Sequence, residues 1–427
     1  MSQRAAFGRQ RRMDHFRDAS WLENTIAKVD GPSMTETSAS PYDVAIVGGG
    51  PAGLAAAIAV AETGARAVLV ARRSPYADNR TTALLGGSVD FLDSLGVWQR
   101  CADKAAALKT MRLVDDTGRL IRAPEVKFVS DEIGLETFGY NIENRELVAA
   151  LEARAAELTN LTRIEDDAAS VQPGDAQVAI ETAQGQTVLA RLAVGADGRQ
   201  SMCRDAAGIA ANRRALDQVA ITFNVAHSRP HRNVSTEFHT PHGPCVFVPL
   251  PGDRSSVVWI NKPGDADRLM ALSDDALSLA IEKQSHSILG RLTVEPGRHR
   301  FPLGIGGPRD LAKNRIVLVG DAAHVVPPIG AQGLNLGLRD ASDLAEMVRD
   351  AGIAGEDIGA PDVIARYARK RRSDIASRTF AIDMANRSLL NDLLPVQLVR
   401  AAGMHAMGAI GPLRRLAMRE GLSPSWR

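Results

Sequence analysis

A glycine-rich turn near residue 50 constrains the fold more than any other feature of the sequence. The apolar run at residues 42–47 predicts a buried strand, and it leads directly into Gly-Gly-Gly-Pro-Ala-Gly at residues 48–53. An alanine-rich helix and a second strand at residues 66–70 are expected to follow. The fingerprint G-x-G-x-x-G is supplied by Gly48, Gly50 and Gly53. Such glycines let the backbone approach a pyrophosphate at a helix N-terminus, so a dinucleotide-binding βαβ unit is predicted.

The end of the second predicted strand departs from the usual dinucleotide-binding pattern. An Asp or Glu commonly stands about 20 residues further on, where it holds the ribose hydroxyls. Here Ala71 is followed by Arg72 and Arg73. Two interpretations stay open. The arginines could bind a 2′-phosphate, which would favour an NADP-linked reductase, or they could be solvated side chains after a strand.

Two aspartates elsewhere in the chain also follow predicted strands. Residues 192–196 lead into Asp197 and a glycine turn, and residues 315–319 lead to Asp321. A glycine- and proline-rich loop after Asp321 opens a helix expected at residues 334–348, so backbone N–H groups and a helix N-terminus converge on one point. With the glycine turn, these segments predict one site divided among three parts of the chain.

Bulk composition excludes several classes of protein. The 427 residues favour two connected domains. With 51 Lys and Arg against 50 Asp and Glu, no net field argues for nucleic acid binding. The three cysteines lack C-x-x-C spacing, so neither a disulfide framework nor a zinc site is indicated, and a reducing compartment fits best. No uncharged apolar stretch of about 18 residues or more occurs, so a membrane-spanning helix is not expected.

Residues 1–41 form a polar, arginine-containing leader that is expected to be disordered and outside the fold. Three interpretations remain open for it: an over-extended start with Met34 as the natural first residue, a disordered tail, or a mitochondrial presequence. Asp14, Asp18 and Glu23 weigh against the presequence, because transit peptides are poor in acidic residues.

The middle and the end of the chain have different patterns. Short segments rich in β-branched residues predict antiparallel strands at 218–228, 235–240, 244–249 and 255–262. A sheet inserted between nucleotide-binding segments is expected to carry the substrate. From residue 361 onward the pattern is helical, and residues 389–416 carry many apolar side chains beside arginines. They either pack on the main body or form a surface that faces lipid or a partner.

The order of the three motifs resembles that of the single-component flavin monooxygenases of the para-hydroxybenzoate hydroxylase type. More narrowly, the chain is similar to the ubiquinone-biosynthesis hydroxylases. The similarity runs from residue 42 to about residue 424. Segments that carry the narrower resemblance are residues 79–84, 95–98, 140–145, 243–244 and 249–250.

The resemblance implies FAD as cofactor and assigns it a set of residues. These are Gly48, Gly50, Gly53, Arg80, Arg145, Asp197, Asp321, Pro328, Gly333 and Asn335. The three glycines would cradle the pyrophosphate, Arg80 and Arg145 would lie near the flavin, and Asp197 would serve both FAD and NAD(P)H. Asp321 would bind the ribitol chain, and residues 328–335 would lie beside the isoalloxazine ring. His324 is expected to hold this loop, and no residue is assigned as catalytic.

The resemblance also implies the chemistry. NAD(P)H would reduce the flavin, O2 would add to give a C4a-hydroperoxide, and the aromatic ring of a polyprenylated phenol would be hydroxylated. A ubiquinone-biosynthesis complex and the inner face of the cytoplasmic membrane are the expected partners of a cytoplasmic, peripheral enzyme. One local departure is the order Gly330-Ala331 where relatives usually have Ala-Gly. Alternatives are another flavin-dependent phenol hydroxylase, the NADP-linked reductase, or an FAD-binding subunit without activity.

The expected fold class is α/β, with a Rossmann-like FAD-binding domain, an inserted mixed or antiparallel sheet and a helical C-terminal region. The expected division is a leader at 1–41, FAD-binding segments at 42–111, 143–210 and 301–350, substrate-domain segments at 112–142 and 211–300, and a C-terminal region at 351–427.

Overall fold

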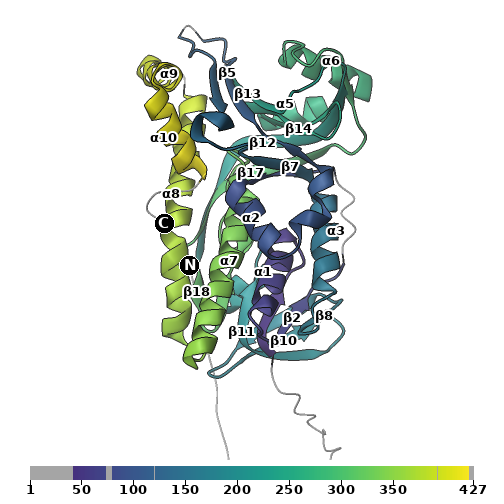
Figure 1. The fold of residues 1–427 in the computed structure, drawn as a ribbon, viewed down its shortest axis with the longest axis vertical. Coiled ribbons are helices and arrows are strands. Elements are labelled where there is room, and N and C mark those ends of the chain that lie inside the picture. Colours follow the sequence, from purple (N-terminus) through teal and green to yellow (C-terminus); the bar gives the residue numbers. More distant parts are fainter. Residues whose placement is uncertain (1–41, 74–78, 120, 392, 423–427) are drawn as a thin grey trace, which may run out of the picture. The chain divides into compact units, whose positions relative to one another are not determined.

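A computed structural model describes residues 42–73, 79–119, 121–391 and 393–422 of the chain. The leader interpretation therefore lies outside the described residues. Two large sheets and one small sheet organise the described part, together with a row of C-terminal helices (Figure 1). This is the mixed α/β class that the sequence predicts.

The first sheet is the nucleotide-binding sheet, and its central strands are parallel. The strand order is β18-β19-β11-β1-β2-β8, with β10 and β9 attached antiparallel beside β11. The bounds are β1 Tyr42–Val47, β2 Ala67–Val70, β8 Leu161–Ile164, β9 Ala168–Pro173, β10 Val178–Thr182, β11 Thr187–Gly195, β18 Ala312–Lys313 and β19 Ile316–Leu318. The central strands β2 and β19 are continuous apolar runs, as expected where both faces of a parallel sheet are covered.

Four of the described helices pack around the nucleotide-binding sheet. Their bounds are α1 Pro51–Glu62, α3 Asn144–Ala155, α4 Met202–Ala206 and α7 Gln332–Ala354. Residues 53–61 of α1 are buried without interruption, which explains why this helix is apolar all round and rich in alanine. Small side chains let α1 pack closely against α7 and α3 (Figure 1).

The second sheet is the substrate sheet, with order β16-β12-β15-β14-β13-β5-β6 and β17 also paired to β12. Among the described strand pairs of this sheet, β13 and β5 are parallel and the others are antiparallel. The bounds are β5 Thr110–Asp115, β6 Val126–Val129, β12 Ala211–His227, β13 Val234–Thr240, β14 Gly243–Leu250, β15 Arg254–Asn261, β16 Leu292–Val294 and β17 His299–Pro308. The predicted antiparallel strands are confirmed, and β17 crosses the expected division at residue 300.

A small sheet and short helices join the two large sheets. The small sheet has the order β3-β7-β4. The bounds are β3 Thr81–Leu85, β4 Ala105–Ala107, β7 Gly139–Glu143, α2 Gly86–Ser94, α5 Pro263–Met270, α6 Asp274–Gln284, and the 3-10 turns η1 Trp98–Arg100, η2 Ala102–Lys104, η3 Ser130–Ile133 and η4 Gly320–Ala322. Helices α5 and α6 pack against one face of the substrate sheet and leave the other face toward β3 and β7.

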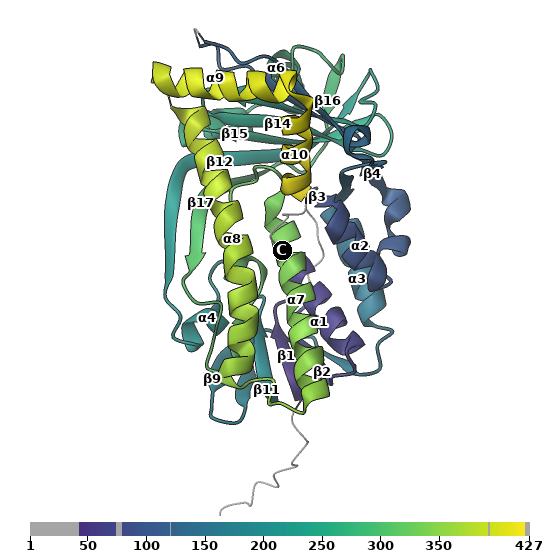
Figure 2. The same ribbon diagram turned by 60° about the vertical axis from the view of Figure 1, so that its left-hand side comes forward.

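Three helices end the described chain, in agreement with the helical pattern that the sequence predicts from residue 361 onward. They are α8 Pro361–Leu390, α9 Leu394–Ala409 and α10 Gly411–Leu422. Figure 2 shows α8 running beside α7, with which it is in contact, and α9 crossing at its end. Among the described helices, none is both long and apolar enough to cross a membrane. All three cysteines of the chain are buried and unpaired.

Candidate functional site

Three neighbouring strands deliver the three sequence motifs to the same edge of the nucleotide-binding sheet. Strand β11 lies between β1 and β19, and all three are parallel. The N–H of Ala196 donates to the carbonyl oxygen of Val47 at 2.8 Å, and the N–H of Val319 donates to that of Gly195 at 3.0 Å. Ligands of open parallel sheets bind outside the carboxyl ends of the strands. The structure therefore brings together the segments that the sequence predicted to form one divided site.

The glycines of the first turn are packed too tightly for any side chain. Gly48 has φ +113°, and a Cβ there would lie 2.4 Å from the carbonyl oxygen of Ala196. A Cβ on Gly53 would lie 2.0 Å from the carbonyl oxygen of Gly48. Helix α1 begins after Gly50 with Pro51 in its first turn, and none of the described side chains caps it. Its first N–H groups are thus available to a pyrophosphate.

The two aspartates differ in how much of each carboxylate is engaged. One oxygen of Asp197 accepts from the N–H of Cys203 at 3.0 Å, and the other is buried without a hydrogen-bond partner among the described residues. Asp321 is half exposed, and the guanidinium of Arg199 lies 3.2 Å from its carboxylate. A buried oxygen without a partner is costly. Asp321 can therefore accept a hydrogen bond from a bound hydroxyl group, whereas the free oxygen of Asp197 is enclosed by the protein.

The second helix N-terminus, that of α7, faces open space. Ala331, the residue before α7, is left-handed with φ +54°, and no described side chain caps the helix. No described atom would lie within 4 Å of a Cβ on Gly330 or Gly333. Pro328 and Gly330 are exposed, whereas Ile329 between them is buried. This turn leaves room for a planar group beside uncapped backbone N–H groups.

Asn335 has a positioning role that the sequence did not reveal. Its side chain is fully buried. The amide oxygen accepts from the N–H of Leu85 at 2.9 Å, and the amide nitrogen donates to the carbonyl oxygens of Ala83 at 2.8 Å and Ala331 at 2.5 Å. Asn335 therefore ties the first turn of α7 to β3. No local sequence signal marks this role, because the partners in β3 are backbone atoms 250 and 252 residues away.

A buried ionic cluster holds the loop after Asp321. His324 is 1% exposed, and its Nε2 lies 2.7 Å from Asp340. The same carboxylate accepts from the N–H of Gly320 at 2.9 Å and from Arg371 of α8 at 2.6 Å. Burial by itself would raise the pKa of Asp340, but the positive charges of His324 and Arg371 and these hydrogen bonds lower it to about 2. The position of His324 is the one expected of a residue that holds this loop.

Arg80 and Arg145, the two arginines expected near the flavin, both interact with other side chains of the protein. The guanidinium of Arg80 lies over the ring of Phe301, 5.2 Å from its centroid. Arg145 pairs with Glu143 and lies 3.4 Å from Glu146. Arg80 thus stands between the nucleotide-binding segments and the substrate sheet. The role of both arginines toward a flavin stays a prediction.

The arginines after β2 have carboxylate partners. Arg72 lies 3.0 Å from Asp167, and Arg73 lies 2.9 Å from Glu165. Ala71 is buried, and its Cβ would lie 2.9 Å from a Cβ on Gly49, so a small residue suits the position. The two cations are therefore already engaged, and the 2′-phosphate interpretation receives no support from them.

Comparison with known proteins identifies the class. Residues 41–379 match the family described as FAD binding domain. The ubiquinone hydroxylase UbiL of Rhodospirillum rubrum is 34% identical over 408 residues, which cover 93% of this chain and 94% of that protein. The 3-demethoxyubiquinol 3-hydroxylase of Escherichia coli is 29% identical over 391 residues, covering 90% and 98%. The chain therefore belongs to the FAD binding domain family, and within it to the FAD-dependent monooxygenases that include these hydroxylases.

A solved structure with the same fold is that of p-nitrophenol 4-monooxygenase PnpA from Pseudomonas putida DLL-E4. The TM-score is 0.73, with 20% identity, and the match covers 90% of this chain and 98% of that one. The described residues also fit FAD in physical terms. They offer a side-chain-free cradle at Gly48, a half-exposed carboxylate on Asp321 and two uncapped helix N-termini.

Proposed function

We propose that this protein is an FAD-dependent monooxygenase that hydroxylates the aromatic ring of a polyprenylated phenol in ubiquinone biosynthesis, with NAD(P)H as reductant and O2 as co-substrate. The observation that carries the proposal is the meeting of three FAD motifs at one sheet edge, beside an open helix N-terminus. The near full-length similarity to ubiquinone hydroxylases supports the substrate class.

The described residues divide the work of holding FAD. Gly48, Gly50 and Gly53 bring backbone N–H groups to the pyrophosphate, and Asp321 accepts from the ribitol hydroxyls. The uncapped turn at Gly333 would place the N-terminus of α7 where it favours negative charge on a bound flavin. Bound and reduced FAD supplies the activation of O2 that the reaction needs. The protein contributes orientation and exclusion of water, and no side chain need act as a nucleophile.

The alternatives predict different behaviour. An NADP-linked reductase would oxidise NADPH without consuming O2, and its only sequence support, Arg72 and Arg73, is paired with acidic residues. An inactive FAD-binding subunit would carry FAD yet oxidise NAD(P)H with no phenolic substrate. A flavin-dependent hydroxylase of other phenols would leave ubiquinone synthesis unchanged when its gene is deleted.

The test combines a deletion with a labelling experiment. Deletion of the gene should cause a ubiquinone precursor lacking one hydroxyl group to accumulate, as detected by mass spectrometry. The purified FAD-loaded protein should then incorporate one atom of ¹⁸O₂ into that precursor. Asp321→Ala should lose bound FAD and product, whereas Asp310→Ala, a change at an exposed carboxylate, should retain both. Ordinary ubiquinone levels with no precursor would refute the pathway assignment.

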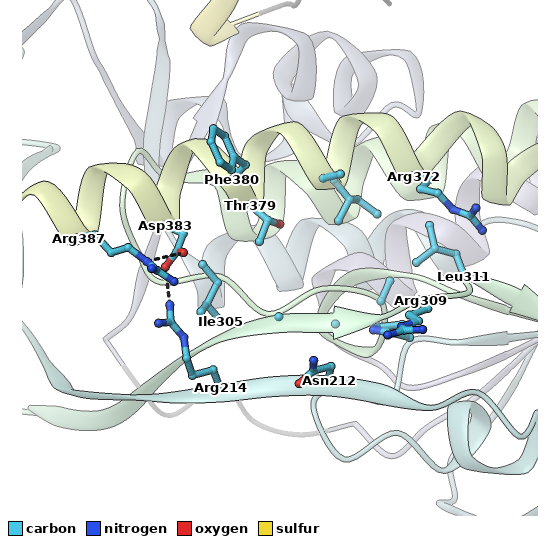
Figure 3. A pocket seen from close by; sticks show the side chains of 16 residues that line it. Asn212, Arg214, Ile305, Arg309, Leu311, Arg372, Thr379, Phe380, Asp383 and Arg387 are labelled. Carbon is cyan, nitrogen blue, oxygen red and sulfur yellow. Dashed lines mark hydrogen bonds and ion pairs between the residues drawn. The ribbon is translucent and has the colours of Figure 1, made fainter.

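The proposal includes contact with a membrane surface through the C-terminal helices. Most large apolar side chains that the described chain leaves exposed lie here: Phe380, Met384, Leu390, Leu393, Leu394, Leu398, Val399, Ile410 and Leu416. A groove of about 590 Å³ runs along α8, and of these apolar side chains Phe380 lines it (Figure 3). Four arginines and one carboxylate are among its lining residues: Arg214, Arg309, Arg372, Arg387 and Asp383. Asp383 pairs with both Arg214 and Arg387, and Arg372 pairs with Asp310, so the groove keeps a smaller excess of positive charge than its arginines alone suggest. Exposed apolar side chains together with this excess suit an acidic lipid surface, where a polyprenylated substrate resides.

Vesicle co-sedimentation tests this contact. The protein should bind vesicles containing phosphatidylglycerol more tightly than vesicles of phosphatidylcholine alone. Leu394→Ser with Leu398→Ser should release it, and Leu279→Ser, at an exposed leucine of α6, should not. A protein that binds neither vesicle but co-purifies with other enzymes through the same leucines would instead use this surface for a ubiquinone-biosynthesis complex.

A further inference from the structure

One face of the substrate sheet carries polar atoms that the described protein leaves unsatisfied. Along β12 the side chains of Val219, Ile221, Phe223 and Val225 enter the core beneath α5 and α6. The alternate residues Ala220, Thr222 and Asn224 point to the opposite face. Because strand side chains alternate with period two, this polar and small set is separated cleanly from the apolar one.

The opposite face looks toward the segments that form the candidate FAD site. Ser256, which pairs with Asn224 in the sheet, lies 2.8 Å from Thr81 of β3 through their hydroxyl oxygens. Asn335 ties the same strand β3 to the first turn of α7. At one margin Arg80 lies over Phe301 of β17. The face is therefore roofed by the elements expected to hold the flavin ring.

Residues on this face form three cross-strand rows. Phe301, Ala220 and Ile260 make an apolar row. His299, Thr222 and Val258 make the next row. Asn224 and Ser256 make the third, which is closed by contacts to Thr81, Asn141 and Glu143. The middle row thus lies between an apolar patch and a closed polar patch.

The middle row holds two of the unsatisfied atoms. Thr222 Oγ1 and His299 Nε2 are both buried and have no hydrogen-bond partner among the described residues. Thr222 and His299 pair directly across β12 and β17, so their side chains lie next to each other on the same face. The His299 ring also stacks on Phe301, with centroids 6.3 Å apart and planes 25° apart. A buried polar atom is costly unless a partner reaches it.

We infer that Thr222 and His299 form the polar subsite that binds the ring hydroxyl of the phenolic substrate, while Val258, Ile260 and Phe301 contact its apolar ring. The inference rests on the proposed function and deepens it by naming residues that orient the ring. Thr222 can donate or accept through its hydroxyl, and His299 can do either through Nε2. Fixing the hydroxyl at one point of the sheet fixes which ring carbon faces the flavin.

Binding to the oxidised, FAD-loaded protein tests the inference without turnover. Substrate precursors with short prenyl chains, and simple phenols, are titrated while the flavin absorbance is followed. Thr222→Val keeps the shape and removes the hydroxyl, and His299→Phe keeps the stacking on Phe301 and removes the nitrogens. Each should weaken binding by about tenfold, as expected for one lost hydrogen bond at a buried site. Thr222→Ser should restore most of the affinity.

Controls separate this effect from a loss of fold or cofactor. Thr293→Val changes an exposed threonine on the neighbouring strand β16 and should leave phenol binding unchanged. FAD affinity and melting temperature should stay near wild type in Thr222→Val. In turnover, the variants should raise KM and release more hydrogen peroxide per NAD(P)H oxidised, because a misplaced ring is hydroxylated less often.

The outcomes distinguish this inference from the proposed function. If wild-type protein binds phenols but forms no hydroxylated product, the proposed function fails and the titration still decides the subsite. If product forms but both Thr222→Val and His299→Phe bind and hydroxylate as wild type does, the subsite is refuted and the function stands. If the wild-type protein binds no phenol at all, the proposed subsite is also refuted.

Discussion

Two helices open toward the proposed cofactor, and the glycines at the start of each are required for different reasons. At the start of α1, a Cβ on Gly48 or Gly53 would lie within 2.4 Å of backbone oxygen. At the start of α7, a Cβ on Gly330 or Gly333 would meet no described atom within 4 Å. The first turn is closed by the protein's own packing, whereas the second is open to whatever binds there.

The difference separates folding from binding. Glycines of the α1 turn let β1, α1 and β11 approach one another, so changing them should damage the fold before it damages cofactor affinity. Glycine at the start of α7 costs helix stability without any packing need in the protein itself. Retaining such a residue makes sense if a ligand occupies the space in front of it. Four substitutions test this comparison.

Gly53→Ala should have the largest effect. Its Cβ would lie 2.0 Å from the carbonyl oxygen of Gly48 and 3.0 Å from the Cβ of Ala196, and neither neighbour is a flexible side chain that could move aside. We expect the free energy of unfolding to fall by more than about 4 kcal/mol, with loss of soluble protein. Thermal unfolding of Gly352→Ala, at an open position near the end of α7, is the matched control. A stable Gly53→Ala protein would contradict the close packing.

Asp340→Asn should have the next largest effect, because it breaks the buried cluster behind the loop. Removing one partner of a buried ion pair typically costs about 3–5 kcal/mol, and Arg371 retains Asp343 and Asp374, so a loss near 3 kcal/mol is expected. FAD should also bind more weakly, since Gly320 and His324 lose their shared anchor.

The stabilisation that Asp340 provides is expected to depend on pH. The folded pKa of Asp340 is lowered from 3.8 to about 2, so its stabilisation is fully present above pH 4 and is lost as pH falls toward 2. The difference in melting temperature between wild type and Asp340→Asn should therefore narrow below about pH 4. A constant difference across this range would mean that the carboxylate charge is not what stabilises the loop.

Gly333→Ala should affect stability and binding in opposite directions. Alanine is favoured over glycine in a helix by about 0.5–1 kcal/mol, and the Cβ meets no described atom, so the FAD-free protein should melt at a higher temperature. FAD should bind several-fold more weakly because the methyl group enters the space in front of the helix. Calorimetry of the FAD-free protein and a flavin titration measure the two effects. Unchanged FAD affinity would remove the argument that a ligand fills this space.

Ala331→Gly should have the smallest effect. Ala331 has φ +54°, a conformation that costs a residue with a Cβ about 1–2 kcal/mol. Glycine avoids this cost, but its greater conformational freedom in the unfolded chain offsets part of the stabilisation. A net stabilisation of no more than about 1 kcal/mol is expected. A small rise in melting temperature checks it, and a fall would show that the Ala331 methyl group makes favourable contacts.

The sequence predicted the parts of the site that depend on local pattern. Gly48, Asp197 and Asp321 each follow an apolar strand, and parallel strands place such residues at a common edge. The helix after Gly330 and the antiparallel segments also followed from periodicity alone. These features are encoded within about ten residues each, which is why a single sequence suffices to find them.

Features that depend on distant pairing could not be predicted. Asp340 and Arg371 lie on two different helices, and nothing in either helix indicates that its charge is buried. Asn335 bonds to backbone, which has no sequence signature. The sequence predicts a strand at residues 218–228, yet only the pairing of Thr222 with His299 of β17 shows which polar side chains share a face.

Burial of the three cysteines affects how readily hydrogen peroxide oxidises them. Reduced flavin that meets O2 without a bound phenol releases hydrogen peroxide, and peroxide oxidises the thiolate form of cysteine. Burial raises the pKa of Cys101 to about 11 and raises those of Cys203 and Cys245 as well. At neutral pH each sulfur is protonated and shielded from solvent. We therefore expect idle turnover to leave these side chains in their reduced form.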